Sequence, residues 1–185
     1  MNDIKKLLYN QVPLNLLSYM SNHIGETFSA NEIAVNSTSS KGATNQTLRL
    51  LLRMGIVSRE QKGNLFLYKS NGESLILKQF KIFENVMQLT GLIEEIKPYC
   101  SEIALFGSRA EGTNNIHSDA DLFIVTEYKD EVNKIMGKQA AEAIKYQAVI
   151  NDPLEVASLQ EHDTAFFEQV KKGITLWKGR ASHGI

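Results

Sequence analysis

The feature that most constrains the fold of this sequence is a pair of short apolar runs, each adjoining small or acidic residues. Residues 102–106 (Glu-Ile-Ala-Leu-Phe) run directly into a Gly-Ser pair, and residues 120–126 (Ala-Asp-Leu-Phe-Ile-Val-Thr) begin beside two aspartates. Apolar runs of this length, bounded by turn-forming residues, are typical of buried β-strands. The sequence therefore predicts two strands joined by a polar loop.

Gly107 and Ser108 immediately follow the first predicted strand. A glycine in this place lets another group approach the backbone closely, and the amides that begin the next helical turn form a site for phosphate oxygens. The hydroxyl of Ser108 adds a hydrogen-bond donor. The pattern therefore favours a turn that binds phosphate.

Asp119 and Asp121 lie at the start of the second predicted strand. Residues i and i+2 of a strand face the same way, about 6.5–7 Å apart along it. Two carboxylates so placed are suited to sharing Mg²⁺ (or Mn²⁺) with a triphosphate, because these cations prefer oxygen ligands, and they suit zinc less well. This interpretation requires both acids to face the turn at Gly107; a polar strand entry facing solvent is the alternative.

The combination of Gly107 and Ser108, ten intervening residues and then Asp119-x-Asp121 resembles the signature of the polymerase-beta-like nucleotidyltransferases, and among them the minimal nucleotidyltransferases. The resemblance implies transfer of a nucleoside monophosphate from an NTP to a hydroxyl acceptor, with release of pyrophosphate and with Mg²⁺ assisting. It also implies that Gly107 and Ser108 hold the β,γ-phosphates, that Arg109 helps to neutralise the triphosphate, and that Asp119 and Asp121 are catalytic residues binding two metals.

The family pattern contains a third carboxylate, on a later strand, which helps to activate the attacking hydroxyl. The strand predicted for residues 146–151 offers Gln147 at this face but no acid. Asp152 or Glu155, just past that strand, substitutes only if the strand ends closer to the metals than we assume. His117, in the loop before the aspartates, is more typical of a solvated histidine than of a ligand. Catalytic competence is therefore left open.

The amino-terminal part has a different pattern. An apolar stripe at residues 14–20 predicts a helix, and Ser29 with Glu32 forms the capping-box arrangement that starts a second, short helix. Residues 47–54 predict a third helix, amphipathic and basic, led by residues 42–46. Two β-prone runs follow, at residues 56–59 and 65–68, and predict a basic hairpin.

This order of elements is similar to winged helix-turn-helix regulators over about residues 4–71. In such domains the third helix enters the major groove of DNA and the hairpin lies along a phosphate ridge. The candidates for base contacts are Thr44, Asn45 and Gln46, and those for phosphate contacts are Lys41, Arg49, Arg59 and Lys62. Residues 1–72 carry eight basic and four acidic side chains, against twelve and seventeen in the remainder, which suits a polyanionic partner for the first part. A purely structural role for this domain is the alternative.

The domain organisation predicted is α+β: a winged helix-turn-helix domain at 1–72, a connecting helix at 73–98 that packs on the second domain, and a minimal nucleotidyltransferase domain at 99–185 with a mixed sheet flanked by helices. Apolar residues recur at helical spacing over residues 74–97, and Pro98 ends that helix. The remaining expectations are a helix at about 130–144, a helix ending near Lys172, an apolar run at 174–177 and a frayed end at 180–185.

Two functions are consistent with these patterns. The first is a DNA-associated nucleotidyltransferase, resembling minimal nucleotidyltransferases that act as antitoxins by nucleotidylating a partner RNase toxin, which regulates its own operon. The second is a transcriptional regulator whose nucleotidyltransferase-like domain is inactive and only binds a nucleotide or a protein partner. A pure interaction module is a third possibility. In the first two cases we expect a homodimer on a palindromic DNA site.

Cysteine usage and hydropathy indicate the compartment. Cys100 is the sole cysteine, and no run of about 18 apolar residues occurs. We therefore expect a cytoplasmic protein without a membrane partner.

Overall fold

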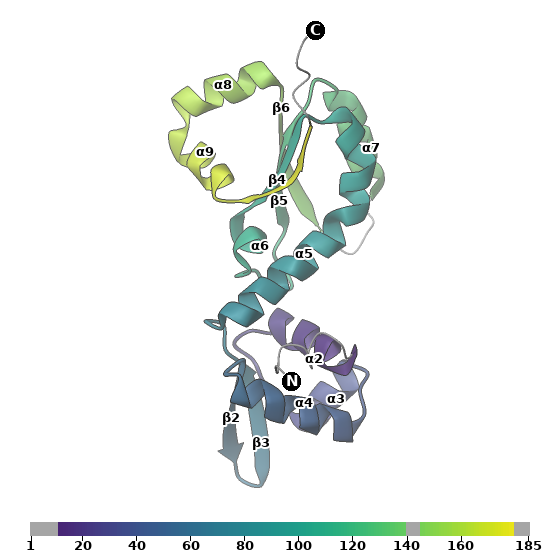
Figure 1. Cartoon of the computed structure of the whole chain (residues 1–185), viewed down its shortest axis with the longest axis vertical. Coiled ribbons are helices and arrows are strands. Elements are labelled where there is room, and N and C mark those ends of the chain that lie inside the picture. The colour runs from purple at the N-terminus through teal and green to yellow at the C-terminus, as the bar shows by residue number, and fades with distance from the viewer. Residues whose placement is uncertain (1–10, 140–144, 180–185) are drawn as a thin grey trace. The chain divides into compact units, whose positions relative to one another are not determined.

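The computed structural model describes residues 11–139 and 145–179, which form two compact units (Figure 1). The first unit comprises the described residues up to Lys81 together with Gly112–Ile116, and the second comprises Ile82–Glu111 and the described residues from His117 onward. The long helix α5 (Leu75–Ile96) contributes its first turns to the first unit and the rest to the second. Among the described residues, no helix is both long and apolar enough to cross a membrane.

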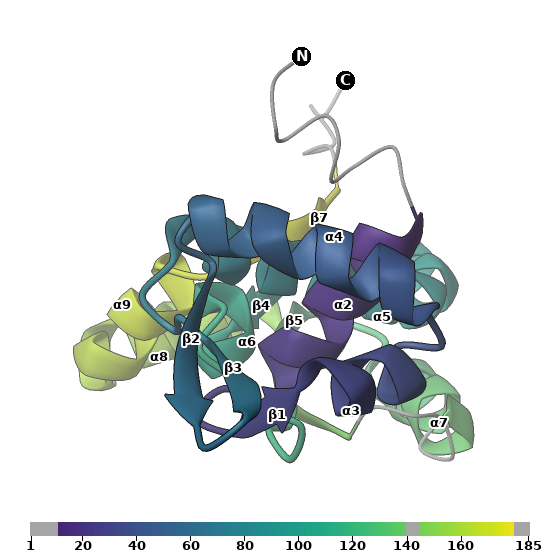
Figure 2. The same ribbon diagram turned by 90° about the horizontal axis from the view of Figure 1, so that it is seen from below.

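The described residues of the first unit form three helices, besides the first turns of α5, and a small antiparallel sheet (Figure 2). Its elements are α2 (Gln11–Asn22), β1 (Thr27–Ser29), α3 (Ala30–Asn36), α4 (Lys41–Arg53), β2 (Val57–Lys62) and β3 (Leu65–Ser70). The predicted helices and hairpin are confirmed as elements, whereas β1, which pairs with β3, was not predicted. A strand of three residues is too short to show an alternating pattern in sequence.

Local signals explain where these helices begin. The side chain of Ser29 accepts a hydrogen bond from the amide of Glu32 (3.3 Å), and the Glu32 carboxylate accepts one from the Ser29 amide (2.7 Å), so the predicted capping box is confirmed. In α4 the cap is Ser40, whose hydroxyl accepts from the amide of Ala43. The helix therefore starts at Lys41, and the polar segment 42–46 belongs to it.

The second unit is built on a mixed four-stranded sheet with the order β6-β5-β4-β7. Its elements after α5 are a 3-10 turn (Lys97–Tyr99), β4 (Glu102–Phe106), α6 (Gly107–Glu111), β5 (Ala120–Val125), α7 (Lys129–Gln139), β6 (Tyr146–Asn151), α8 (Pro153–His162), α9 (Thr164–Lys171) and β7 (Ile174–Lys178). β4 pairs antiparallel with β5 and β7, whereas β5 and β6 are parallel. The expected mixed sheet flanked by helices is thus observed.

Both faces of this sheet are covered by helices (Figure 1). On one face, Leu92 and Ile96 of α5 and Val132 of α7 pack with the inward residues of β4 and β5. On the other face, Phe166 and Val170 of α9 pack with strand residues of opposite parity. Central strands buried on two sides explain why β4 and β5 are apolar apart from Glu102 and Asp121.

One predicted helix after β5 differs from expectation, and two predicted segments extend beyond the described residues. The helix expected at about 130–144 is observed as α7 to Gln139, and residues 140–144 lie outside the described part of the chain, as does the tail at 180–185. The single helix expected to end near Lys172 is two helices, because Asp163 leaves the helical conformation (φ −133°, ψ 65°) and caps α9 through the amide of Phe166. The apolar run at 174–177 is strand β7.

The single cysteine is structural. Cys100 is buried, and burial raises the pKa of its thiol to about 11. The thiolate is the reactive form of cysteine, so this side chain is a poor nucleophile near neutral pH.

Two glycines of the second unit give a paired test of this packing. A Cβ at Gly173 would lie 2.3 Å from the carbonyl oxygen of Leu105, whereas one at Gly137, inside α7, would meet no atom within 4 Å. We expect Gly173→Ala to lower the free energy of unfolding by about 1–3 kcal/mol through overpacking. We expect Gly137→Ala to raise it by roughly 0.5–1 kcal/mol through helix propensity. Urea unfolding measures both, and equal effects of the two substitutions would contradict the described packing.

Candidate functional site

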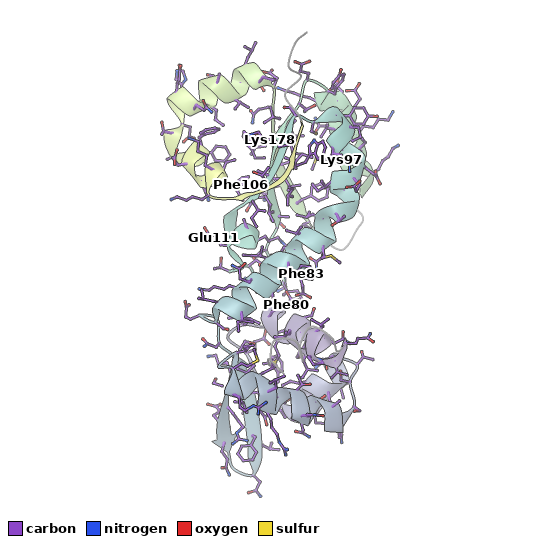
Figure 3. All side chains as sticks on the ribbon, in the orientation of Figure 1. Phe80, Phe83, Lys97, Phe106, Glu111 and Lys178 are labelled. Carbon is purple, nitrogen blue, oxygen red and sulfur yellow. The ribbon has the colours of Figure 1, made fainter. Side chains whose placement is uncertain are left out.

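The two predicted parts of the site meet because β4 and β5 are antiparallel neighbours. Phe106, the last residue of β4, pairs with Asp121. In Figure 3, Phe106 and Glu111 mark the start and end of the segment that carries Gly107 and Ser108. The residue after Phe106 is Gly107, and the carboxylate of Asp121 lies close to it. A Cβ added to Gly107 would be 2.4 Å from Asp121 Oδ2. The structure therefore brings an acid directly against the Gly-Ser turn.

Gly107 is required at this point for two reasons. Its φ is 68°, in the left-handed region that favours glycine, and the space a side chain would occupy is filled by Asp121. Ser108, beside it in α6, is half-buried. The missing side chain of Gly107 therefore lets the Asp121 carboxylate lie against the backbone of the turn.

A third polar side chain joins the acids from the parallel strand β6. Gln147 is the register partner of Asp121, and its Nε2 donates a hydrogen bond to Asp119 Oδ2 (3.1 Å). The sequence placed Gln147 on this face but did not reveal the contact with Asp119, because that depends on the pairing of β5 with β6. The site thus consists of two carboxylates and one amide.

The electrostatics of the pair favour a cation. Partial burial raises the pKa of Asp121, the negative charge of Asp119 raises it further, and the positive charge of Arg109 opposes both. A cation beside the two carboxylates would offset the negative charge that disfavours ionisation of Asp121. Their oxygens, with the amide oxygen available from Gln147 by rotation, are the ligand type that Mg²⁺ and Mn²⁺ prefer, so the residues fit such a cation.

Arg109 is a positioning residue in this structure. It is 7% exposed, its Nε and Nη2 donate to the carbonyl oxygen of Ser118 (3.1 and 2.8 Å), and its Nη1 donates to Asn85 Oδ1 (2.8 Å). Asn85, 4% exposed in α5, returns a bond from Nδ2 to the Arg109 carbonyl (2.9 Å). The expected direct contact of Arg109 with a triphosphate is therefore not supported, since its guanidinium is directed at protein groups.

This network has two consequences. It holds the carbonyl of the residue before Asp119, and so orients the acidic pair. Burial lowers the pKa of Arg109 while Asp119 and Asp121 raise it, so its positive charge acts on the pair through space. The role of Asn85 was not predicted from the sequence. The available signal was a polar residue within the apolar pattern of a helix.

The two alternative third acids lie away from the pair. Asp152 follows the end of β6, about 16 Å along the strand from Gln147 at the usual rise per residue. It caps α8 with Glu155, and Lys129 forms ion pairs with both acids. Within residues 11–139 and 145–179, no group of three or more His, Cys, Asp or Glu side chains is placed to hold a metal ion. Asp152 and Glu155 were candidates only if the strand ended closer to the metals than assumed, and β6 ends at Asn151 as assumed. His117 is exposed in the loop before Asp119.

The residues predicted to contact DNA divide into two groups. Most are exposed: Lys41, Asn45, Gln46 and Arg49 on α4, and Arg59 and Lys62 on β2. Thr44 is 0% exposed, and its hydroxyl oxygen has no hydrogen-bond partner among the described residues. The structure therefore does not support the predicted contact of Thr44 with DNA bases. Because α4 begins a turn earlier than expected, Thr44 lies on the buried side of this helix.

Comparisons with known proteins place the second unit. Residues 92–180 match the family described as Polymerase beta, Nucleotidyltransferase. No curated protein matches this chain. A solved structure of a proposed nucleotidyltransferase from Sulfolobus solfataricus is 18% identical, with a TM-score of 0.38, over 60% of this chain and 90% of that one. A proposed transcriptional regulator for arsenical resistance is 16% identical, with a TM-score of 0.35, over 53% of this chain and 97% of that one.

The family match includes β4, the Gly107 turn, both aspartates and the strand that carries Gln147. What the comparisons show is thus a match of residues 92–180 to a nucleotidyltransferase domain of the polymerase-beta type.

Proposed function

We propose that the second unit binds a nucleoside triphosphate with Mg²⁺ and transfers its nucleoside monophosphate to a hydroxyl acceptor. The observation that carries the proposal is the contact of the Asp121 carboxylate with Gly107. A carboxylate against this turn supports the proposal that Asp121 holds a cation while Gly107 and Ser108 hold phosphate oxygens. The family match over residues 92–180 supports the same assignment.

Each residue of the site has a role in this proposal. Asp119 and Asp121 hold the cation, which when bound neutralises phosphate charge. Arg109 and Asn85 keep the acidic pair in place from within the protein. In the reaction, the acceptor oxygen bonds to the α-phosphorus, the bond from that phosphorus to the bridging oxygen breaks, and pyrophosphate leaves. The acceptor proton passes to water, since the described residues place no third acid beside the pair.

The lack of a third acid beside the pair, among the described residues, favours a second candidate function. Gln147 stands beside Asp121 and is neutral at all pH values, so it cannot take a proton from the acceptor. A domain that binds nucleotide without transferring it would act as a sensor in a transcriptional regulator. The two candidates share the nucleotide site and differ in the fate of the nucleotide.

We propose that the first unit is a winged helix-turn-helix domain that binds DNA. Its α4 exposes Lys41, Asn45, Gln46 and Arg49, and the exposed strand β2 of the hairpin carries Arg59 and Lys62. These positions suit a helix in the major groove and a wing on phosphates. A homodimer on a palindromic site, and a protein acceptor such as a toxin that the chain modifies, complete this proposal.

Labelled nucleotide separates the two candidates for the second unit. Purified protein with Mg²⁺ and α-labelled NTP in cell extract should transfer label, and Asp121→Asn should reduce transfer on the order of 100-fold or more because cation affinity falls. Asp130→Asn, which removes an exposed acid of α7, is the matched control and should leave transfer unchanged.

The outcomes of that experiment are distinct. Binding of an NTP analogue that depends on Asp121, without label transfer, would establish the sensor and reject the enzyme. An absence of nucleotide binding, or binding untouched by Asp121→Asn, would reject both.

The salt dependence of DNA binding tests the first unit. Each phosphate contact contributes about 0.9 to the slope of log affinity against log salt concentration. We expect Arg59→Ala with Lys62→Ala to reduce that slope by roughly 2. Lys134→Ala with Lys138→Ala removes the same charge from exposed positions of α7 and should leave the slope as it is. Fluorescence anisotropy measures the slope, and DNA affinity that is independent of salt would remove this proposal.

A further inference from the structure

The amide of Gln147 occupies the position from which a third ligand could reach the acidic pair. β5 and β6 run parallel with Asp121 opposite Gln147, so these two residues start side by side on one face of the sheet. The Nε2 of Gln147 then donates to Asp119 Oδ2. The neighbour of this carboxylate is therefore an amide, which brings no negative charge to the cluster whichever of its atoms faces the acids.

The charge at this position also limits how many cations can bind. Two divalent cations held about 3.5–4 Å apart need several anionic ligands to offset their mutual repulsion. Asp119 and Asp121 supply two negative charges, and the buried guanidinium of Arg109 opposes them. In the part of the chain that the structure describes, no third acidic side chain joins the cluster.

We infer that this site binds a single divalent cation per nucleotide, shared by Asp119, Asp121 and the triphosphate, because the amide of Gln147 supplies no third negative charge for a second. The inference rests on the proposed binding of an NTP in the second unit. It departs from the pair of metals that the resemblance implied. It makes the number of bound cations depend on the side chain at position 147, since an acid there would supply the missing charge and remove the N–H donor.

The ratio of bound Mn²⁺ to bound nucleotide tests this inference without any measurement of activity. In equilibrium dialysis with a non-hydrolysable ATP or GTP analogue, the full-length protein should retain one Mn²⁺ per analogue. Gln147→Glu should retain two. Because Gln147 is exposed, this substitution leaves the core of the sheet intact, and circular dichroism checks the fold.

Two control variants separate the acid from other effects of substitution. Gln147→Ala removes the donor without adding charge and should retain one Mn²⁺ per analogue. Val149→Glu adds the same charge two residues along the same face of β6, opposite Phe123, and should also retain one. A second Mn²⁺ per analogue in either control would show that a negative charge at position 147 is not what admits the second cation. That result would overturn the inference.

The remaining outcomes are distinguishable. Two Mn²⁺ per analogue in the wild-type protein, or one in Gln147→Glu, would overturn the single-cation inference while leaving nucleotide binding in place. Retention of neither Mn²⁺ nor analogue by the wild-type protein would overturn the proposed function, and the inference with it.

Discussion

The contact between the Asp121 carboxylate and the Cα of Gly107 is the constraint on which the site depends. It exists because Phe106 and Asp121 are register partners across β4 and β5, so the residue after one strand meets the acid of the other. Gly107 can fill that place because it lacks a Cβ and adopts a positive φ. A shift of the pairing by one residue would turn Asp121 to the opposite face of the sheet, away from Gly107.

Local sequence patterns predicted the elements and the acids, and long-range pairing decided the rest. The strand-glycine and acid-strand junctions are local, so Gly107, Ser108, Asp119 and Asp121 could be selected from the sequence. The bond from Gln147 to Asp119 needs the parallel pairing of β5 and β6, and the burial of Arg109 needs Asn85 from a helix 24 residues earlier. Thr44 was misassigned because its facing depends on where α4 begins.

The two units suggest complementary chemistry in one chain. The first exposes basic residues on α4 and β2, and the second keeps an acidic pair beside a glycine turn. A neutral amide next to that pair affects the activation of an acceptor more than the holding of a triphosphate, because the phosphates bring their own charge to the cation. The two proposed functions use such a site in different ways. In the enzyme, a partner protein provides the acceptor; in the sensor, nucleotide binding is itself the signal.

A crystal structure with Mn²⁺ and a non-hydrolysable NTP analogue tests the central claim most directly. We expect an anomalous manganese peak coordinated by Asp119 and Asp121, with the analogue's phosphates beside Gly107 and Ser108. Nucleotide and manganese bound elsewhere on the protein, with these two carboxylates free of both, would contradict it.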